Sequence, residues 1–138
     1  MELSRRAPTA SGPKDRFTGD VYVDRISSGG DSGVVASSVR FTPGAHTAWH
    51  SHSRGQTLHC TDGLGLVVTA DKVIVLRPGD TVWTPPNERH WHGAVADRFM
   101  THLALLASDA GQQDTTWQEL VRSEEYISAC ACAEEGVR

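Results

Sequence analysis

The amino-acid sequence predicts an all-β fold, a sandwich or barrel of short strands followed by one C-terminal helix. Hydrophobic and polar residues alternate with a period of two through most of the 138 residues, as in strands that bury one face. Turn sequences such as Pro43-Gly44 and Asp62-Gly63 separate the alternating segments at short, even intervals. Many short strands joined by tight turns are typical of β-sandwiches and β-barrels.

The strands follow from this alternation in chain order. Residues 34–42 are rich in β-branched side chains and end at the turn pair Pro43-Gly44. The side chains that share one face of this strand are Val35, Ser37, Val39 and Phe41. Further short strands are predicted at residues 57–61, 64–69, 72–76, 81–84, 90–95 and 99–105.

One helix is predicted, at about residues 116–125, docked against the outside of the strands. Thr116 to Glu119 has the form of a capping box, and Trp117, Leu120 and Val121 recur at helical spacing behind it. Residues 1–14 and 128–138 are expected to be loose ends around a core at about 16–112. The whole of 1–138 is interpreted as one domain, because its length is too short for two.

Composition excludes several classes of function. A formal net charge of −4 argues against nucleic acid as a partner. No apolar run approaches the roughly 18 residues of a membrane span, and the polar N-terminus does not resemble a signal peptide. Three cysteines give no disulfide framework, so a cytoplasmic location is expected. Cys130 and Cys132 are interpreted as part of a flexible tail in preference to a metal or redox site.

The histidines are the strongest functional signal, because all seven lie between His46 and His102. Residues two apart on a strand share a face, so His50 and His52 can point inward together. Gln56 follows after a turn, and His90 arrives from a later strand. Three imidazoles and one amide form a metal site, which we prefer to the alternative of surface histidines with coincidental spacing.

The neutral glutamine affects the chemistry expected of this site. An amide leaves the metal with about +2 of charge, where a carboxylate would leave about +1. The more positive centre polarises a bound hydroxyl or carbonyl strongly and disfavours a trivalent metal. Lewis-acid chemistry is therefore favoured over oxygen activation. Manganese, iron, nickel and zinc can all occupy such a donor set.

The remaining histidines are assigned by strand parity. His92 shares the inward parity of His90 and is a candidate for an acid–base or metal-supporting role. His102 lies on an apolar inward face, where we favour a general base over a buried structural residue. His59 is expected to point outward, and the role of His46 stays open.

The spacing of these residues resembles the cupin family. Gly44, His50, His52 and Gln56 followed by Gly63 resemble its first motif, with glutamine in place of the usual glutamate. Gly79, Pro85 and His90 resemble the second motif, with Asn87 in the usual glycine place and Ala94 where asparagine is common. The resemblance implies a small jelly-roll barrel that binds one divalent metal per subunit through His50, His52, Gln56 and His90.

Much of the chain is also similar to the bacterial cupin hydroxynitrile lyases. The similar segments are residues 17–19, 41–45, 47–50, 55–58, 78–80, 90–94 and 100–104. This similarity implies manganese as the metal and cleavage or formation of a cyanohydrin such as mandelonitrile. It also implies that Ser37, Val39 and Leu106 line the substrate pocket.

The metal site and the two further histidines suggest a mechanism. The metal would acidify the cyanohydrin hydroxyl, and His102 would take its proton. His92 would offset the charge of the leaving cyanide. The expected pocket wall consists of Val39, Phe41, Thr47, Trp83 and Met100. An oxygen-dependent cupin such as a dioxygenase is one alternative, distinguished by iron dependence and oxygen uptake. A non-catalytic binder of small ligands is another. A homodimer or larger homo-oligomer is expected, in which the loose N-terminal segment can be exchanged between neighbouring subunits.

Overall fold

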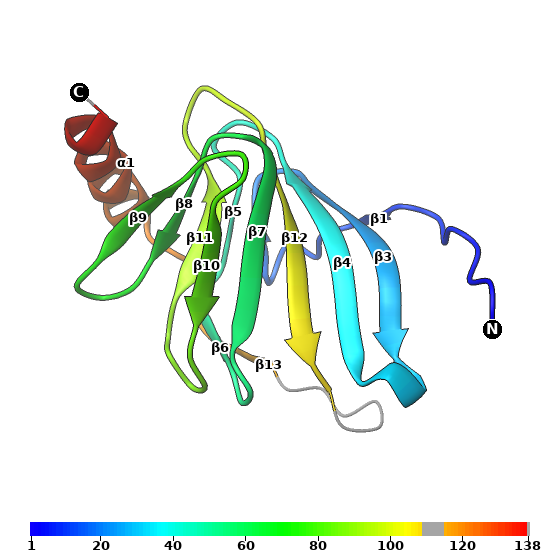
Figure 1. The fold of residues 1–138 in the computed structure, drawn as a ribbon. Helices are drawn as coiled ribbons and strands as arrows, with labels where there is room; N and C mark the ends of the chain where they lie inside the picture. Colours follow the sequence, from blue (N-terminus) through cyan, green and yellow to red (C-terminus); the bar gives the residue numbers. More distant parts are fainter. Residues whose placement is uncertain (109–114, 138) are drawn as a thin grey trace.

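The protein is an antiparallel β-barrel of the jelly-roll type with one C-terminal helix, which confirms the predicted fold class (Figure 1). The computed structural model describes residues 1–108 and 115–137. A six-stranded sheet in the order β1-β3-β4-β12-β7-β10 faces a five-stranded sheet in the order β2-β5-β11-β8-β9, and β6 pairs with β13. The elements are β1 (Ala10–Ser11), β2 (Phe17–Thr18), β3 (Val21–Gly29), η1 (Gly30–Ser32), β4 (Val34–Phe41), β5 (His46–Thr47), β6 (His50–His52), β7 (Gln56–Gly63), β8 (Gly65–Val68), β9 (Val73–Leu76), β10 (Thr81–Thr84), β11 (Trp91–Ala94), β12 (Met100–Ala107), β13 (Thr115–Trp117) and α1 (Ser123–Val137).

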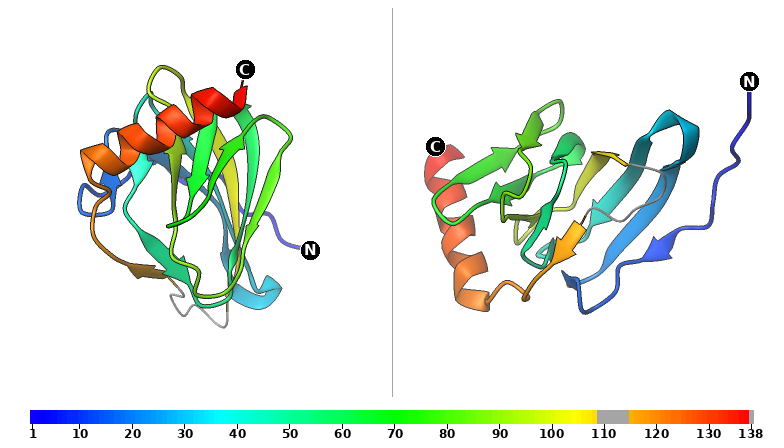
Figure 2. Two further views of the ribbon diagram at one scale, coloured as in Figure 1. Left: turned by 90° about the vertical axis from the view of Figure 1, so that its left-hand side faces the viewer. Right: turned by 90° about the horizontal axis from the view of Figure 1, so that it is seen from below.

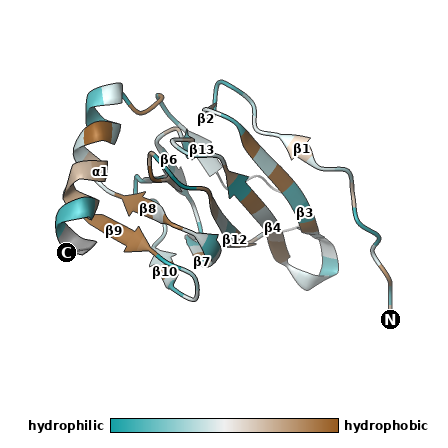
Figure 3. Cartoon of the chain, turned by 90° about the horizontal axis from the view of Figure 1, so that it is seen from above, coloured by the Kyte–Doolittle hydropathy of each residue, from teal (hydrophilic) through white to brown (hydrophobic). Residues whose placement is uncertain are grey.

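Alternation along the strands sorts side chains between the barrel interior and solvent, as Figure 3 shows for β3 and β4. Phe41, Leu58 and Met100 point inward and are fully buried in the core between the sheets. A second core cluster, which includes Trp49, Trp91 and Ala129, lies where α1 packs beside β8 and β9 (Figure 2). The helix therefore covers the outer face of the five-stranded sheet at β8 and β9, and the first core cluster fills the space between the two sheets.

Two residues with positive φ shape the backbone beside these strands: Asn87 lies in a turn before β11, whereas Gly63, predicted to lie in a turn, is the last residue of β7. Asn87 has a φ of 65°, and its backbone amide donates to the carbonyl of His52 at 2.8 Å. Asparagine tolerates this left-handed conformation, which explains its position where the related motif has glycine. Gly63 also has a positive φ, and a Cβ there would lie 1.9 Å from the carbonyl oxygen of Phe99.

The predicted helix at 116–125 is wrong in position. Residues Thr115–Trp117 form β13 and pair with β6, and α1 begins at Ser123. The capping interaction belongs to Arg122 and Glu125, because the Glu125 carboxylate accepts the backbone N–H of Arg122 at 3.1 Å. Residues expected to be a loose tail are helical as far as Val137, and Ala129 and Ala133 are buried. No helix in the described ranges is long and apolar enough to cross a membrane.

The N-terminal residues are also more ordered than the sequence predicts. Ala10–Ser11 forms β1, which pairs with Val23 and Tyr22 of β3. The nine-residue strand β3 was not among the predicted strands, because its alternation is broken by a bulge between Arg25 and Ser27. Residues 10–11 thus form an edge of the six-stranded sheet, whereas residues 1–9 are exposed and have no secondary structure, as predicted for a loose end.

Candidate metal centre

Three buried imidazoles converge inside the barrel. His50 and His52 lie on β6, and His90 lies directly before β11; one ring nitrogen from each falls within 4.8 Å of the others. His50 and His90 exchange backbone hydrogen bonds of 2.9 Å in both directions, which fixes their strands side by side. Gln56, at the first position of β7, is also buried. The structure therefore brings together the histidines predicted from the spacing.

The hydrogen bonds of the three rings determine which nitrogen faces the centre. Nδ1 of His50 donates to the carbonyl of Ala48 at 2.8 Å, and Nδ1 of His90 donates to the carbonyl of Glu88 at 2.9 Å. Nδ1 of His52 lies 3.0 Å from the Thr115 hydroxyl. A ring that carries its proton on Nδ1 offers the lone pair of Nε2 to a metal.

This donor set fits a divalent cation. Nε2 of His90 and Oε1 of Gln56 are buried, and neither has a hydrogen-bond partner among the described residues. Burial lowers the pKa of both His50 and His90, so these rings are neutral at pH 7, as metal ligation requires. Orphaned buried acceptors are costly unless something satisfies them. A metal held by three imidazoles and one amide would satisfy them.

Beside this cluster lies a pair of hydrogen-bonded histidines. Nε2 of His102 and Nδ1 of His92 are 3.0 Å apart, so one ring donates a hydrogen bond to the other. Burial lowers the pKa of His102 to about 4 and that of His92 well below its usual range. Since the ring centres of His92 and His50 are 5.2 Å apart, this pair adjoins the metal cluster.

A cavity of about 700 Å³ opens from these groups toward solvent. His50, His52, Gln56, His92 and His102 lie along its inner part. The predicted pocket residues on its wall are Ser37, Val39, Thr47 and Leu106. A volume of this size is typical of sites for small organic ligands.

Three other predicted wall residues lie elsewhere. Trp83 is 57% exposed, since Val82 and Thr84 take the inward positions of β10 opposite Leu58 and Gln56. Met100 is packed in the core and does not line the cavity. Phe41 lies behind the histidine pair, with its ring centre 5.3 Å from that of His102.

Comparison with known proteins identifies the family. Residues 37–105, half of the chain, match the cupin domain. This chain belongs to the cupin family. The match begins at β4 and ends in β12, so it includes every histidine discussed above.

Individual cupins extend the similarity to nearly the full chain. The protein is 44% identical to an (R)-mandelonitrile lyase from Granulicella tundricola over 91% of this chain and 98% of the relative. A cupin-like protein from Thermotoga maritima has 34% identity and a TM-score of 0.81, covering 94% of this chain and 97% of its own. A cupin-2 domain from Rhodospirillum rubrum shares the fold at 18% identity and a TM-score of 0.69, covering 99% and 95%.

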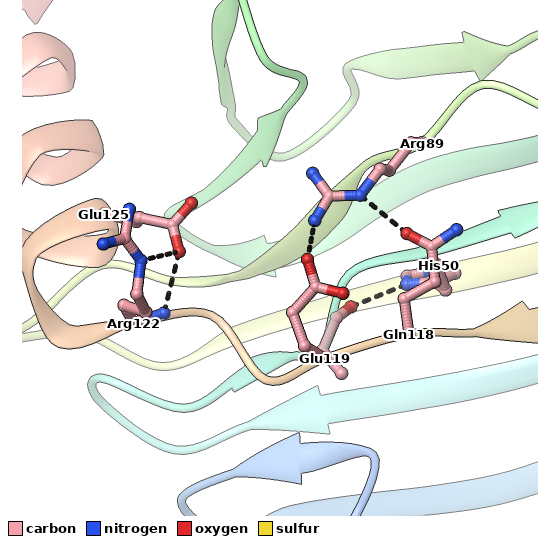
Figure 4. A network of polar contacts seen from close by, with 7 residues as sticks. His50, Arg89, Gln118, Glu119, Arg122 and Glu125 are labelled. Carbon is pink, nitrogen blue, oxygen red and sulfur yellow. Dashed lines mark hydrogen bonds and ion pairs between the residues drawn. The ribbon is translucent and has the colours of Figure 1, made fainter.

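The C-terminal strand of this cupin contributes side chains that sequence reasoning missed. Trp117 pairs with His50 across the β13–β6 ladder, and their ring centres are 4.7 Å apart. Thr115 contacts His52 as described above. Arg89, the neighbour of His90, holds the residues after β13 by bonding Gln118 at 2.6 Å and Glu119 (Figure 4). The β-branched pair before Trp117 was the available signal, outweighed by the apparent capping box.

The last two histidines lie outside the cavity. His59 points outward on β7, and its Nδ1 lies 2.7 Å from the Thr81 hydroxyl, as expected from its parity. His46 is buried on the helix side, where its ring stacks on Tyr126 at 4.4 Å. The cupin barrel therefore separates these two histidines from the four that line the cavity and from His90 beside them.

Proposed function

We propose that the protein is a metal-dependent lyase that cleaves or forms cyanohydrins of the mandelonitrile type. The observation that carries this proposal is the 44% identity to an (R)-mandelonitrile lyase across 98% of that protein. The buried donor set and the adjoining histidine pair support it, because such a reaction needs an electrophilic centre beside a base.

His50, His52, Gln56 and His90 would hold the metal, which we propose to be manganese. When bound, the metal supplies Lewis-acid polarisation of the substrate oxygen. Imidazole and amide are uncharged ligands, so this donor set would leave the full charge of the metal to polarise the substrate oxygen. The hydrogen bonds to Ala48, Glu88 and Thr115 keep the rings oriented before anything binds.

His92 and His102 would accept the proton of the substrate hydroxyl and return it to the product. Both rings are neutral at pH 7, so the pair accepts the proton of the substrate hydroxyl as the C–C bond breaks and its electrons leave with cyanide. The pair then returns that proton to cyanide, which departs as hydrogen cyanide and leaves the aldehyde. The 3.0 Å contact between the rings allows a proton received by one to be shared with the other.

The wall beyond the histidines would hold the organic group. Val39 and Leu106 provide apolar contact from the six-stranded sheet, and Trp117 provides an aromatic face from β13. Burial of an aromatic ring against such side chains is favourable and excludes water from the reacting carbon.

The test is a cyanide-release assay with mandelonitrile on protein of known metal content. We expect activity with manganese, loss on chelation and recovery when manganese is returned. Failure of manganese-loaded protein to release cyanide would contradict the proposal, and oxygen uptake by iron-loaded protein would support a dioxygenase instead.

We also propose that the protein is a homodimer or larger homo-oligomer. Leu103 and Leu105 alternate with the cavity-facing residues of β12 and lie on the outer face of the six-stranded sheet. Tyr22 and Ile26 of β3 are exposed apolar side chains. A stable exposed apolar face favours association between subunits. Light scattering coupled to size-exclusion chromatography measures the mass, and a monomer at micromolar concentration would contradict this part.

A further inference from the structure

The side chains of the cavity wall become more polar with distance from the histidine cluster. Across β3, β4 and β12, the strand register aligns Val23 with Val39 and His102 in one row. The next inward-facing row consists of Arg25, Ser37 and Ala104, and all six residues line the cavity. Two residues along an antiparallel strand span about 7 Å. The backbone of Arg25, whose side chain is exposed at the cavity wall, therefore lies about 7 Å along the sheet from the row that contains His102.

The β-bulge after Arg25 adds a further polar group to this part of the wall. Without a bulge, strict alternation would place Arg25 and Ser27 on one face and Ser28 on the other. The register shift between Arg25 and Ser27 instead allows both Arg25 and Ser28 to line the cavity. Bulges commonly re-aim side chains beside binding sites.

A second arginine reaches the same cavity from the N-terminal segment. Arg16 is half-buried, and its guanidinium carbon lies 5.4 Å from the ring centre of Trp117, which also lines the cavity. Contact with the aromatic face orients the guanidinium and leaves its N–H edge available for a planar anion.

Among the described residues, the charged side chains that line this cavity are of one sign. Arg16 and Arg25 line it, and no Asp, Glu or Lys does so among the described residues. By contrast, Arg89 and Arg122 outside the cavity are paired with Glu119 and Glu125. Although the whole chain has a net charge of −4, the described lining of this cavity has two cationic side chains and no anionic one. Such a field attracts anionic ligands.

We propose that the outer part of the cavity is an oxyanion subsite, and that the substrate carries a carboxylate or phosphate remote from its reacting carbon. Arg16 and Arg25 bind this group, and Val39 and Leu106 contact the apolar body between the two ends. The identity of the reacting end rests on the proposed lyase function; the oxyanion subsite rests on the arginines and the register. The substrate class is therefore an aromatic aldehyde or cyanohydrin bearing an acidic substituent.

The experiment compares benzaldehyde, 4-formylbenzoate and 4-formylphenyl phosphate in cyanohydrin formation by the manganese-loaded protein. We expect kcat/KM for at least one charged aldehyde to exceed that for benzaldehyde by about tenfold, falling as salt is added. The better charged substrate identifies carboxylate or phosphate as the group recognised. Equal or lower kcat/KM for both charged aldehydes would overturn the proposal.

Variants show whether the arginines cause the preference. Arg16→Gln and Arg25→Gln should each reduce the ratio of charged to neutral kcat/KM by about fivefold, the effect of one partly exposed charge-assisted contact. Arg40→Gln is the matched control, because Arg40 follows the cavity-lining Val39 on β4 and points to the opposite face. An unchanged ratio in both cavity variants, or an equal loss in the control, would overturn the assignment.

Direct binding separates this inference from the lyase proposal. Calorimetric titration of manganese-loaded protein with 4-formylbenzoate and 4-formylphenyl phosphate, without cyanide, should give affinities that Arg25→Gln weakens by about fivefold. If the protein leaves mandelonitrile intact yet shows this arginine-dependent binding, the subsite stands and the lyase proposal fails. If mandelonitrile is cleaved and binding is the same in wild type and Arg25→Gln, the anions occupy the metal alone and the subsite is wrong.

Discussion

His46 and His50 begin from the same local geometry and have different surroundings. Each is buried, and each ring donates through Nδ1 to the carbonyl two residues earlier, His46 to Gly44 at 2.9 Å and His50 to Ala48 at 2.8 Å. The His46 ring stacks on Tyr126 of α1, with an interplanar angle of 12°. The His50 ring faces those of His52 and His90.

The difference shows what distinguishes a candidate metal ligand from another buried histidine in this barrel. Burial lowers the pKa of both rings, and the backbone bond orients both. Only His50 stands on a strand whose inward side meets two other imidazoles and an amide. Convergence of lone pairs from several strands, and not the state of any one ring, therefore distinguishes the cavity from the helix side.

The largest expected effect comes from removing a ligand. His50→Ala or His90→Ala should abolish stoichiometric metal binding, because a fixed barrel cannot supply another imidazole at that position. His46→Phe, which keeps an aromatic ring against Tyr126, should retain full metal content. Elemental analysis of the three purified variants checks this. Full metal occupancy in the His50 and His90 variants, or loss in the His46 variant, would contradict the distinction.

A smaller loss is expected at the histidine pair. His102→Ala should keep metal content near wild type and reduce turnover of mandelonitrile by roughly 10²–10⁴, the usual contribution of a positioned base. A purely structural histidine would instead leave the folded enzyme active but less stable, owing to the cavity created. Melting temperature, metal content and rate measured on one preparation decide between these outcomes.

The next effect concerns the hydroxyl that orients His52. Thr115→Val keeps the side-chain shape and removes the 3.0 Å contact, so metal affinity should fall by roughly 10- to 100-fold, as for other groups that orient metal ligands. Thr116→Val is the matched control, because Thr116 is exposed on the other face of β13. Competition with a calibrated chelator measures both affinities. Equal values for the two variants would show that the hydroxyl has no such role.

Gln56→Glu should change activity more than metal binding. The carboxylate adds a negative charge beside the metal, so the metal should bind as tightly or more tightly, and the substrate oxygen should be less polarised. We expect cyanohydrin cleavage to fall by about tenfold, or about 1.4 kcal/mol in the barrier. Unchanged or higher activity with full metal occupancy would show that the neutral amide is not needed for catalysis.

Features set by local sequence were predicted correctly, whereas features set by contacts between distant segments were missed. Alternation and turn residues predicted most strands correctly, and the spacing of His50, His52 and His90 predicted the clustering of their rings, because parity within a strand is a local property. β13 was missed because its capping-box sequence is overruled by pairing with β6, more than sixty residues earlier in the chain. Arg25 was missed because the bulge beside it has no signature in the period of two.

The smallest expected effect is the contribution of His46 to the loss of folding stability in acid. Its pKa is lowered by burial, so the unfolded state binds a proton more readily than the folded state as pH falls below about 6.5. Folding stability contributed by the neutral ring is complete above that pH and is lost as pH falls toward the lower folded pKa.

His46→Phe removes this titration. It also leaves the Gly44 carbonyl without its donor, which should cost about 1–3 kcal/mol at neutral pH. The variant should therefore be less stable than wild type at pH 7, with a smaller drop in the free energy of unfolding between pH 7 and pH 5. Urea denaturation of metal-free protein at both pH values measures the two differences. An equal acid-induced drop in the two proteins would show that His46 does not titrate with folding, and would leave the cavity histidines as the source of acid sensitivity.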